Sequence, residues 1–435
     1  MLMSPKPQNV ILLSIDALRA DHLSCNGYHR ETTPNIDRIA ADNLQFTNAF
    51  SPSSHTREAV PALLTGRYPD EAVDGGYHLD ADTVAAQFRN RGYTTGAFHS
   101  NPFLSRAYDY DMDFDKFDDD LHISQHRLIV LAQRVIDKLQ NRHYARADTI
   151  NKRSLKWIDL LARTRSPFFL WNHYMDVHGP YEPPERYQEL YRHEAVSRRA
   201  AQKLYKRAID APESITGAER QTLIDLYDAE IRYIDDRLGS FLSELSEREL
   251  LNESLIIITS DHGDGFGEHG YYEHPRRLDT ELVHVPLVIS HPTLAHNQHS
   301  EAVSTLDIVP TIHDAFSFSM ASESYPGESL LQILDGLNEH TSRLIFSQAS
   351  GEGNESTLRR FAARSTTDAH TIEFDINSRE VPREDDEVEC DRRAINSLYK
   401  HVRERLSAGS LSRSSGNSSA NSEVEERLRA LGYRE

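Results

Sequence analysis

The fold is decided by the stretch Asn9-Val-Ile-Leu-Leu-Ser-Ile-Asp16, a nearly continuous apolar run that ends in an acid. Two similar runs follow later in the chain, Pro167-Phe-Phe-Leu-Trp-Asn-His173 and Leu255-Ile-Ile-Ile-Thr-Ser-Asp261. Short apolar runs without polar alternation are typical of β-strands that are buried on both faces. We therefore expect these three segments at the centre of a parallel sheet.

Segments with helical patterns separate the apolar runs. The sequence predicts further strands over 44–50, 92–98 and 285–290, and helices over 33–41, 56–64, 81–91, 121–165 and most of 186–248. Strands that alternate with helices indicate an α/β fold in which helices cover both faces of a parallel sheet.

The regular pattern weakens after residue 320. Residues 345–375 contain short strand-like pieces, and residues 408–422 are rich in Ser, Gly and Asn, which is typical of a flexible linker. We therefore divide the chain into a catalytic α/β domain over 1–325, with a helical insertion at about 186–222, and a smaller α+β subdomain over 326–407. A linker and a terminal helix, the latter expected over 423–431, complete the chain over 408–435.

The charge balance limits the partners of the protein. The 435 residues include 68 Asp and Glu against 48 Lys and Arg, a net charge of −20, and only 8 of the cations are Lys. This balance argues against nucleic-acid binding, which needs a basic surface. A dense acidic surface repels itself less in molar salt, where the Debye length falls to about 3 Å, so we hypothesise a halophilic, high-salt source.

Targeting and redox signals are weak. No apolar run reaches the ~20 residues that a transmembrane helix needs, and the amino terminus lacks a signal-peptide pattern. Cys25 and Cys390 are too few for a disulfide framework. The sequence predicts a cytoplasmic protein without a transmembrane segment, and it says nothing about the oligomeric state.

Two of the apolar strands end in acids that predict a metal site. Asp16 follows the first strand, and Asp261 with His262 follows the third. The carboxyl ends of parallel strands meet at one edge of a sheet, and buried acids are costly there unless a positive charge lies between them. Two carboxylates and an imidazole can hold one divalent cation and leave positions open. For either acid alone, a helix cap or a surface turn is an equally good interpretation.

A third segment carries a hydroxyl at the start of an apolar helix. In Ser53-Ser-His-Thr56-Arg-Glu-Ala-Val-Pro-Ala-Leu-Leu-Thr-Gly66, Thr56 precedes the helical pattern. A Thr at this position is commonly a simple N-cap. A helix amino terminus also favours anions, so a hydroxyl activated by a metal there can attack a phosphorus or sulfur centre.

The chain resembles the sulfatase family of the alkaline phosphatase superfamily. The matching segments cover roughly residues 9–320 and the carboxyl-terminal tail, and they follow the order of the family. They are the strand that ends at Asp16, Asp21-His-Leu-Ser-Cys-Asn-Gly-Tyr28, Thr33-Pro-Asn-Ile-Asp37, Leu63-Leu-Thr-Gly-Arg-Tyr-Pro69, His99-Ser-Asn-Pro102, Asp176-Val-His-Gly-Pro-Tyr181, Ser260-Asp-His-Gly263, Val285-Pro-Leu-Val-Ile289, Asp307-Ile-Val-Pro-Thr311 and Glu426-Arg-Leu-Arg-Ala-Leu-Gly-Tyr433.

The resemblance implies a mixed, mainly parallel sheet flanked by helices and a site for one divalent metal ion. Its ligands would be Asp16, Asp261 and His262, with the nucleophile as a further ligand. Many members carry two adjacent acids after the first strand, whereas Ala17 follows Asp16 here. With an imidazole and one carboxylate fewer, Mg²⁺ or Mn²⁺ is favoured, and Ca²⁺ or Zn²⁺ stays open.

The nucleophile departs from the family pattern. Ten residues before Gly66, where many sulfatases carry the Cys or Ser that becomes formylglycine, this chain has Thr56. Glu58 and Val60 stand at the positions of the motif's Pro and Arg, so formylglycine is not expected. An alignment shifted to Ser53 keeps a Ser-to-Arg spacing but inserts nearly one helical turn, which would rotate the hydroxyl away from the metal.

Three functional interpretations stay open. The set of motifs favours a metal-dependent hydrolase of a sulfate ester, on a glycan or another anionic substrate. Thr56 favours a phosphoester hydrolase or phospho-group transferase, because related transferases use Thr through a phospho-enzyme. The third interpretation is a non-catalytic, sulfatase-like binding protein, and metal content would distinguish it. If Thr56→Ala kept its activity, Ser53, Ser54 or a water molecule would be the nucleophile.

Further residues are candidates for substrate contacts. The resemblance assigns His178 to the first His of a His-x-Pro-His motif, with Tyr181 at the second, and it places His274, Arg276 and Arg277 near a cationic substrate contact. His269 is a weaker candidate for a second metal ligand, and His99 and Asn101 are expected to shape a strand end. The cations of the insertion are interpreted as a solvated helix face or, alternatively, as a lid or glycan-docking surface: Arg192, Arg198, Arg199, Lys203, Lys206 and Arg207.

Overall fold

Three fully buried strands form the centre of the main sheet in this computed structural model. They are β1 (Asn9–Ile15), β5 (Phe168–Tyr174) and β6 (Ser254–Ser260). β1 pairs in parallel with β5 on one side and with β6 on the other. The prediction of a parallel core built from the three apolar runs is therefore confirmed. The structure describes residues 7–120, 144–291, 294, 296–318, 325–334, 343–366, 368–378 and 392–407.

The whole sheet has eight strands in the order β10-β2-β9-β6-β1-β5-β3-β4. The outer strands are β2 (Leu44–Phe50), β3 (Thr94–Phe98), β4 (Lys116–Asp118), β9 (His284–Ser290) and β10 (Asn297–Ser304). β9 runs antiparallel to both of its neighbours, β2 and β6, while the other pairs are parallel. The sheet is thus mixed and mainly parallel, as the family resemblance implies.

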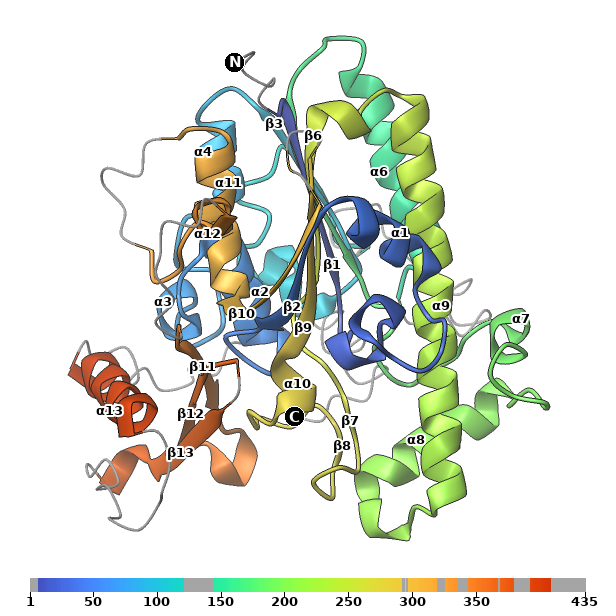
Figure 1. The fold of residues 1–435 in the computed structure, drawn as a ribbon, viewed down its shortest axis with the longest axis vertical. Coiled ribbons are helices and arrows are strands. Elements are labelled where there is room, and N and C mark those ends of the chain that lie inside the picture. Colours follow the sequence, from blue (N-terminus) through green and yellow to red (C-terminus); the bar gives the residue numbers. More distant parts are fainter. Residues whose placement is uncertain are drawn as a thin grey trace.

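Helices cover both faces of the sheet (Figure 1). Alternate residues of β1 divide between two hydrophobic cores, because successive side chains of a strand point to opposite faces. Ile11 and Leu13 pack in the core beneath α1 (Pro34–Asp42), α6 (Ala147–Leu161) and α9 (Gly217–Glu247). Val10 and Leu12 pack in the opposite core, beneath α2 (Thr56–Thr65), α4 (Val84–Arg89), α11 (Ile308–Ala315) and α12 (Leu330–Leu334).

A small second sheet lies beside the main one. The antiparallel strands β11 (Ile345–Ser350), β12 (Leu358–Arg364) and β13 (Ala369–Asp375) carry α13 (Arg392–Ser407), whose Leu398 and Val402 pack on Phe361. The short helices are α3 (Pro69–Ala72), α7 (Glu185–Gln188) and α10 (Thr280–Val283), and a two-stranded hairpin is formed by β7 (Gly265–Phe266) and β8 (Tyr272–Glu273).

Several local predictions differ from the structure. The helix expected over 81–91 is shorter, Val84–Arg89, because the preceding Thr83 caps its amino terminus. Of the helix expected over 121–165, residues 121–143 lie outside the described part, and the remainder forms Ala147–Leu161. β10 and α13 were not predicted. The expected linker and terminal helix over 408–435 also lie outside the described residues.

The helical insertion contains α8 (Arg198–Asp210) and the start of α9. Most of its cations face acids rather than solvent alone. Ion pairs join Arg192 to Asp225, Arg198 to Glu182, Lys206 to Asp210 and Arg207 to Glu219. This pairing favours the interpretation of a solvated, charge-balanced helix face. Within the described residues, no helix is both long and apolar enough to cross a bilayer.

Candidate metal centre and active site

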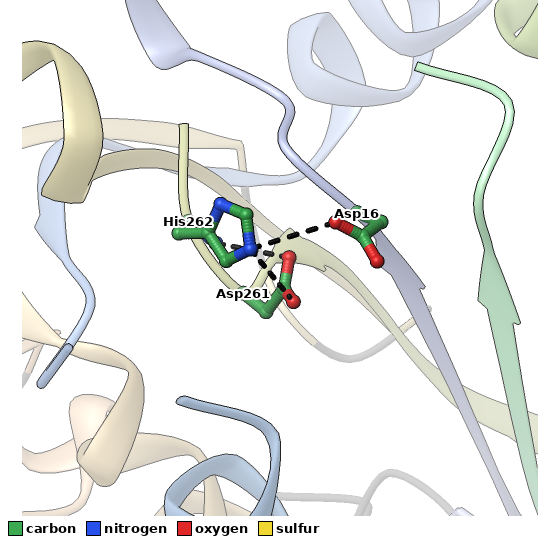
Figure 2. Close-up of side chains that lie close together, drawn as sticks. All are labelled: Asp16, Asp261 and His262. Carbon is green, nitrogen blue, oxygen red and sulfur yellow. Dashed lines mark hydrogen bonds and ion pairs between the residues drawn. The ribbon is translucent and has the colours of Figure 1, made fainter. Parts of the chain in front are cut away.

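Asp16, Asp261 and His262 meet at one edge of the sheet, as Figure 2 shows. Asp16 directly follows β1, and Asp261 with His262 follows the adjacent β6. All three residues are buried, and each offers one donor atom within 4.8 Å of the others. His262 Nε2 lies 3.5 Å from Asp16 Oδ1 and 3.5 Å from Asp261 Oδ2. The sequence prediction that these residues converge is therefore confirmed.

The hydrogen bonds of Asp16, Asp261 and His262 leave one atom of each side chain available to bind a metal ion. Asp261 Oδ1 accepts from the backbone N–H groups of Ala17 (3.3 Å) and His262 (2.9 Å). The Nδ1 atom of His262 lies 2.8 Å from the carbonyl oxygen of Gly263. Since a carbonyl only accepts, Nδ1 carries the proton and Nε2 keeps its lone pair. Asp16 Oδ1 and Asp261 Oδ2 are buried, and neither has a hydrogen-bond partner among the residues that the structure describes.

The electrostatics of the two acids match a bound cation. Burial raises the pKa of Asp261, and the negative charge of nearby Asp16 raises it further. Burial also opposes ionisation of Asp16, but the nearby His178 and a hydrogen bond from His173 outweigh it and hold the pKa of Asp16 below the usual range. Two buried carboxylates this close repel each other unless a cation lies between them.

The donor set fits a divalent metal ion. Atoms bound to one such ion at about 2.1 Å stand roughly 3.0–3.5 Å apart, close to the separations seen here. Asp16, Asp261 and His262 would hold the ion, and the two unpartnered carboxylate oxygens are the atoms that need it most. A set of two carboxylates and one imidazole suits Mg²⁺, Mn²⁺ or Zn²⁺ better than it suits Ca²⁺, because Ca²⁺ is typically bound by oxygen ligands alone.

Thr56 places its hydroxyl at this centre. It is the first residue of α2, and His55 rather than Thr56 caps that helix through a hydrogen bond from the N–H of Arg57. Thr56 is fully buried, and its Oγ1 lies 3.1 Å from His262 Nε2. The simple N-cap interpretation of Thr56 is therefore wrong, since His55 performs that function.

The two alternative hydroxyls have other partners. Ser53 Oγ donates to Glu58 Oε2 at 2.6 Å, and Ser54 Oγ points to the carbonyl of Pro275 at 3.4 Å. Both are buried, but neither has a hydrogen bond to the acid–histidine cluster. Of the three hydroxyls in this segment, Thr56 alone contacts a candidate metal ligand.

Three further imidazoles surround the centre. The centroid of the His274 ring lies 4.5 Å from the ring centroid of His262, 4.9 Å from that of His178 and 5.6 Å from that of His55. Burial lowers the pKa of His274 to about 4. Burial opposes protonation of His178 too, but Asp16 and other nearby acids raise its pKa above the usual value. The structure thus brings His178 and His274 to the site, with His178 the better proton donor.

The loop that carries His178 is held from both sides. Tyr181 OH donates to Asp264, whose other oxygen lies 3.4 Å from His274 Nδ1. Tyr205 of α8 packs against Gly179 so closely that a Cβ atom there would meet its ring at 2.1 Å. A larger residue at position 179 would require Tyr205 to move, so the insertion helix packs directly on the His178 loop.

Arg276 lies near the candidate site, where its guanidinium forms ion pairs with two acids. Its guanidinium lies 3.0 Å from Glu58 Oε1 and also pairs with Glu352. Glu58 belongs to α2, and Glu352 follows β11 of the small sheet. Arg276 therefore joins the helix of Thr56, the loop of His274 and the small sheet.

The small sheet holds the site loops through further contacts. The backbone N–H of Gln348 donates to the carbonyl of Pro52 at 2.8 Å, and Ser347 Oγ donates to that of Ser51 at 2.7 Å. From β12, Arg360 donates to the carbonyl of Arg276 at 2.8 Å. The small sheet is thus part of the framework around the candidate site, which its sequence did not indicate.

His269 lies in a different group. It is half exposed and faces Glu281 and Asp279 at 3.4 and 3.8 Å. These three residues form a separate candidate cluster, apart from the one at Asp16. Arg277 stacks over Tyr271. Neither His269 nor Arg277 has a contact with Asp16, Asp261, His262 or Thr56.

Sequence reasoning missed two side chains that contact Asp16. Asn101 Nδ2 donates to Asp16 Oδ2 at 2.9 Å, so Asn101 does more than shape a strand end. His173 Nε2 lies 3.3 Å from the same oxygen. His173 was included only in an apolar strand. A histidine inside a buried strand is the only sequence feature that points to His173. It can be linked to Asp16 only when the pairing of β5 with β1 is known.

The comparisons with known proteins fit this geometry. The family model described as Sulfatase matches residues 8–318, which is most of the chain. The chain belongs to the sulfatase family. Human iduronate 2-sulfatase is 26% identical over 335 residues, 65% of this chain and 60% of the human protein. The arylsulfatase of Clostridium perfringens strain 13 is 24% identical over 383 residues, 76% of this chain and 79% of that enzyme. The matched part of the chain therefore spans about three fifths of the length of its human relative.

Solved structures show the same fold. The phosphonate monoester hydrolase of Agrobacterium radiobacter matches with a TM-score of 0.67 at 21% identity, covering 93% of this chain and 96% of that one. A protein solved in complex with its substrate D-glucosamine-2-N,6-O-disulfate matches with a TM-score of 0.66 at 17% identity, covering 98% of each chain. These likenesses show that the chain has the same mixed, mainly parallel fold as these two proteins.

Proposed function

We propose that this sulfatase-family protein is a metal-dependent hydrolase of sulfuric esters in which Thr56 is the nucleophile. One observation carries the proposal: a buried hydroxyl, two buried unpartnered carboxylate oxygens and an imidazole nitrogen converge at the carboxyl edge of the sheet. The named activities of the relatives, which include aryl and glycan-type sulfatases, support the substrate class.

The chain's own residues define a two-step reaction. When bound, a divalent cation supplies positive charge that polarises the ester oxyanion and favours loss of the Thr56 proton. The Thr56 proton passes to solvent water, Thr56 Oγ1 attacks sulfur, an Oγ1–S bond forms, and the S–O bond to the alcohol breaks. His178, with its raised pKa, gives its proton to the departing alcohol oxygen.

Water completes the cycle. A water molecule attacks the sulfur held on Thr56, the Oγ1–S bond breaks, and Thr56 takes a proton back from solvent. The product leaves as hydrogensulfate, which releases its proton to solvent and becomes sulfate. His178, now neutral, accepts the proton that the water loses. His274 is neutral near pH 7 because its pKa lies near 4, so it serves as a hydrogen-bond partner of the oxyanion rather than as an acid.

A second candidate is hydrolysis or transfer of a phosphoester. It is favoured by the same Thr56, because an unmodified hydroxyl cannot release sulfate by the hemiacetal collapse available to formylglycine. The phosphonate monoester hydrolase among the structural neighbours supports it further. The metal, Thr56 and His178 would have the same roles at phosphorus.

A parallel assay tests the proposal. Wild-type protein loaded with Mn²⁺ or Mg²⁺ is given 4-nitrophenyl sulfate, 4-nitrophenyl phosphate and bis(4-nitrophenyl) phosphate, with Asp261→Ala as the control that lacks a ligand. We expect the highest kcat/KM on the sulfate and loss of turnover in the control. Turnover of the phosphoesters alone would support the second candidate. A metal-loaded protein without any turnover would support a binding protein.

The acidic surface is assigned to a high-salt environment. The net charge is −20, and repulsion between surface acids weakens as salt shortens the Debye length. We expect the melting temperature to rise as KCl increases from 0.1 to 2 M. A flat or falling profile would contradict this assignment.

A further inference from the structure

We propose that His173 and Asn101 are positioning residues of the metal centre, which hold Asp16 so that only its Oδ1 atom faces the cation. The inference rests on the metal site of the proposed function. It concerns a hydrogen-bonded network behind the site, defined here as Trp171, Ser14, His173, Asn101 and Asp16, all of which are fully buried.

The register of two strands builds the network. Ser14 of β1 lies opposite His173 of β5 in the parallel pair. Trp171 stands two residues before His173 and therefore on the same face of β5. This face is the one beneath α2, whose first residue is Thr56. The network thus lies directly behind the edge of the sheet where the ligands converge.

The direction of each hydrogen bond follows from its chemistry. Trp171 Nε1, which can only donate, lies 2.9 Å from Ser14 Oγ. Ser14 Oγ lies 2.9 Å from His173 Nδ1, and His173 Nε2 lies 3.3 Å from Asp16 Oδ2. An ionised carboxylate only accepts, so Nε2 carries a proton. In the neutral ring Nδ1 then accepts from the Ser14 hydroxyl.

Asn101 supplies the second donor to the same oxygen. Its Oδ1 accepts from the backbone N–H of Phe103 at 2.9 Å, which fixes the orientation of the amide. The Nδ2 group must then face Asp16, and it donates to Oδ2 at 2.9 Å. Asp16 Oδ2 therefore has two donors, whereas Oδ1 has none and faces His262.

The network compensates for a small set of ligands. Ala17 occupies the position at which many members carry a second acid, so Asp16 supplies the only carboxylate from β1. A side chain with free rotation would present either oxygen or both. Outer hydrogen bonds of this kind orient a ligand, and losing one typically weakens metal binding about 10–100-fold.

Paired substitutions of His173 separate the hydrogen bond from packing. In His173→Gln, the side-chain amide places an N–H donor near the position of Nε2 and keeps the hydrogen bond to Asp16. In His173→Asn, the shorter side chain reaches only the position of Nδ1, beside Ser14, and loses that bond. His99→Gln is the matched control. His99 is also buried, its ring lies 5.4 Å from that of Trp171, and within the described residues its ring nitrogens make no hydrogen bond.

The first measurement is the Kd for Mn²⁺ of each metal-free protein by calorimetry, with thermal unfolding as a check that the fold is kept. We expect His173→Asn to bind about 10–100-fold more weakly, and His173→Gln and His99→Gln to bind within about threefold of the wild type. Wild-type affinity in folded His173→Asn would overturn the proposal. Equal weakening in all three variants would also overturn it, since packing would then be the cause.

The second measurement does not need a metal. Nitrogen NMR of ¹⁵N-histidine-labelled protein, with the His173 signals assigned by their loss in His173→Gln, reports the tautomer. We expect protonated Nε2 and unprotonated Nδ1. The opposite tautomer would overturn the proposal. A wild type that binds no divalent ion would instead refute the proposed function, and the tautomer would still decide whether the network exists.

Discussion

Replacement of Thr56 by Ala is expected to abolish turnover while leaving the protein folded. The side chain is fully buried, and within the described part of the chain it has one hydrogen bond, to His262 Nε2 at 3.1 Å. Truncation removes a methyl group, worth roughly 0.8 kcal/mol, and a hydrogen bond, worth roughly 0.5–1.5 kcal/mol. No capping energy is lost, because His55 caps the helix. The free energy of unfolding should therefore fall by about 2 kcal/mol.

A loss of this size keeps the protein folded, because domains are stable by roughly 5–15 kcal/mol. Removal of a nucleophile costs far more in rate, and we expect kcat to fall at least about 10³-fold, which is roughly 4 kcal/mol of activation free energy. The assays are urea unfolding and turnover of 4-nitrophenyl esters with Mn²⁺. Thr56→Ser, which keeps a hydroxyl, is the control and should retain measurable turnover. Activity of Thr56→Ala within tenfold of the wild type would refute Thr56 as the nucleophile.

Two further predictions concern the framework around the site. Arg276→Gln should lower the free energy of unfolding by roughly 3 kcal/mol, because it leaves the buried Glu58 without its cation, and adding Glu58→Gln should restore part of that loss in urea unfolding. Unchanged stability with a raised KM would instead make Arg276 a substrate contact. His401 is buried and stacks on Phe346, and burial is the main cause that lowers its pKa to about 4. Between pH 6.5 and 4 the folded state therefore binds fewer protons than the unfolded state. Stability should therefore fall as the pH drops through that window, by up to about 3 kcal/mol, and His401→Phe should remove this part of the pH dependence in parallel unfolding titrations; identical profiles for the two proteins would contradict the prediction.

The sequence predicts the parts of the site that local patterns encode. Asp16 and Asp261 were recognisable because an apolar run ends at each of them, and the carboxyl ends of adjacent parallel strands meet. Thr56 was recognisable from its distance to Gly66 and the helix between them. Each of these inferences needs only a short segment and one general rule of sheet geometry.

The remainder depends on pairings that no local pattern encodes. His173 reads as part of an apolar strand, and it reaches Asp16 only because β5 pairs with β1 in one particular register. The sequence suggests that Arg276 contacts the substrate. In the structure it pairs with two acids, one from α2 and one from the loop after β11. The antiparallel direction of β9 and the contacts of the small sheet are tertiary features of the same kind.

The most direct test of the account is a crystal of the wild-type protein soaked in Mn²⁺ and measured at a wavelength where manganese scatters anomalously. We predict one strong anomalous peak per chain, bound by Asp16 Oδ1, Asp261 Oδ2 and His262 Nε2, with Thr56 Oγ1 beside it. A fully soaked crystal with no peak among these atoms would contradict the central claim that the two strand ends form a metal centre.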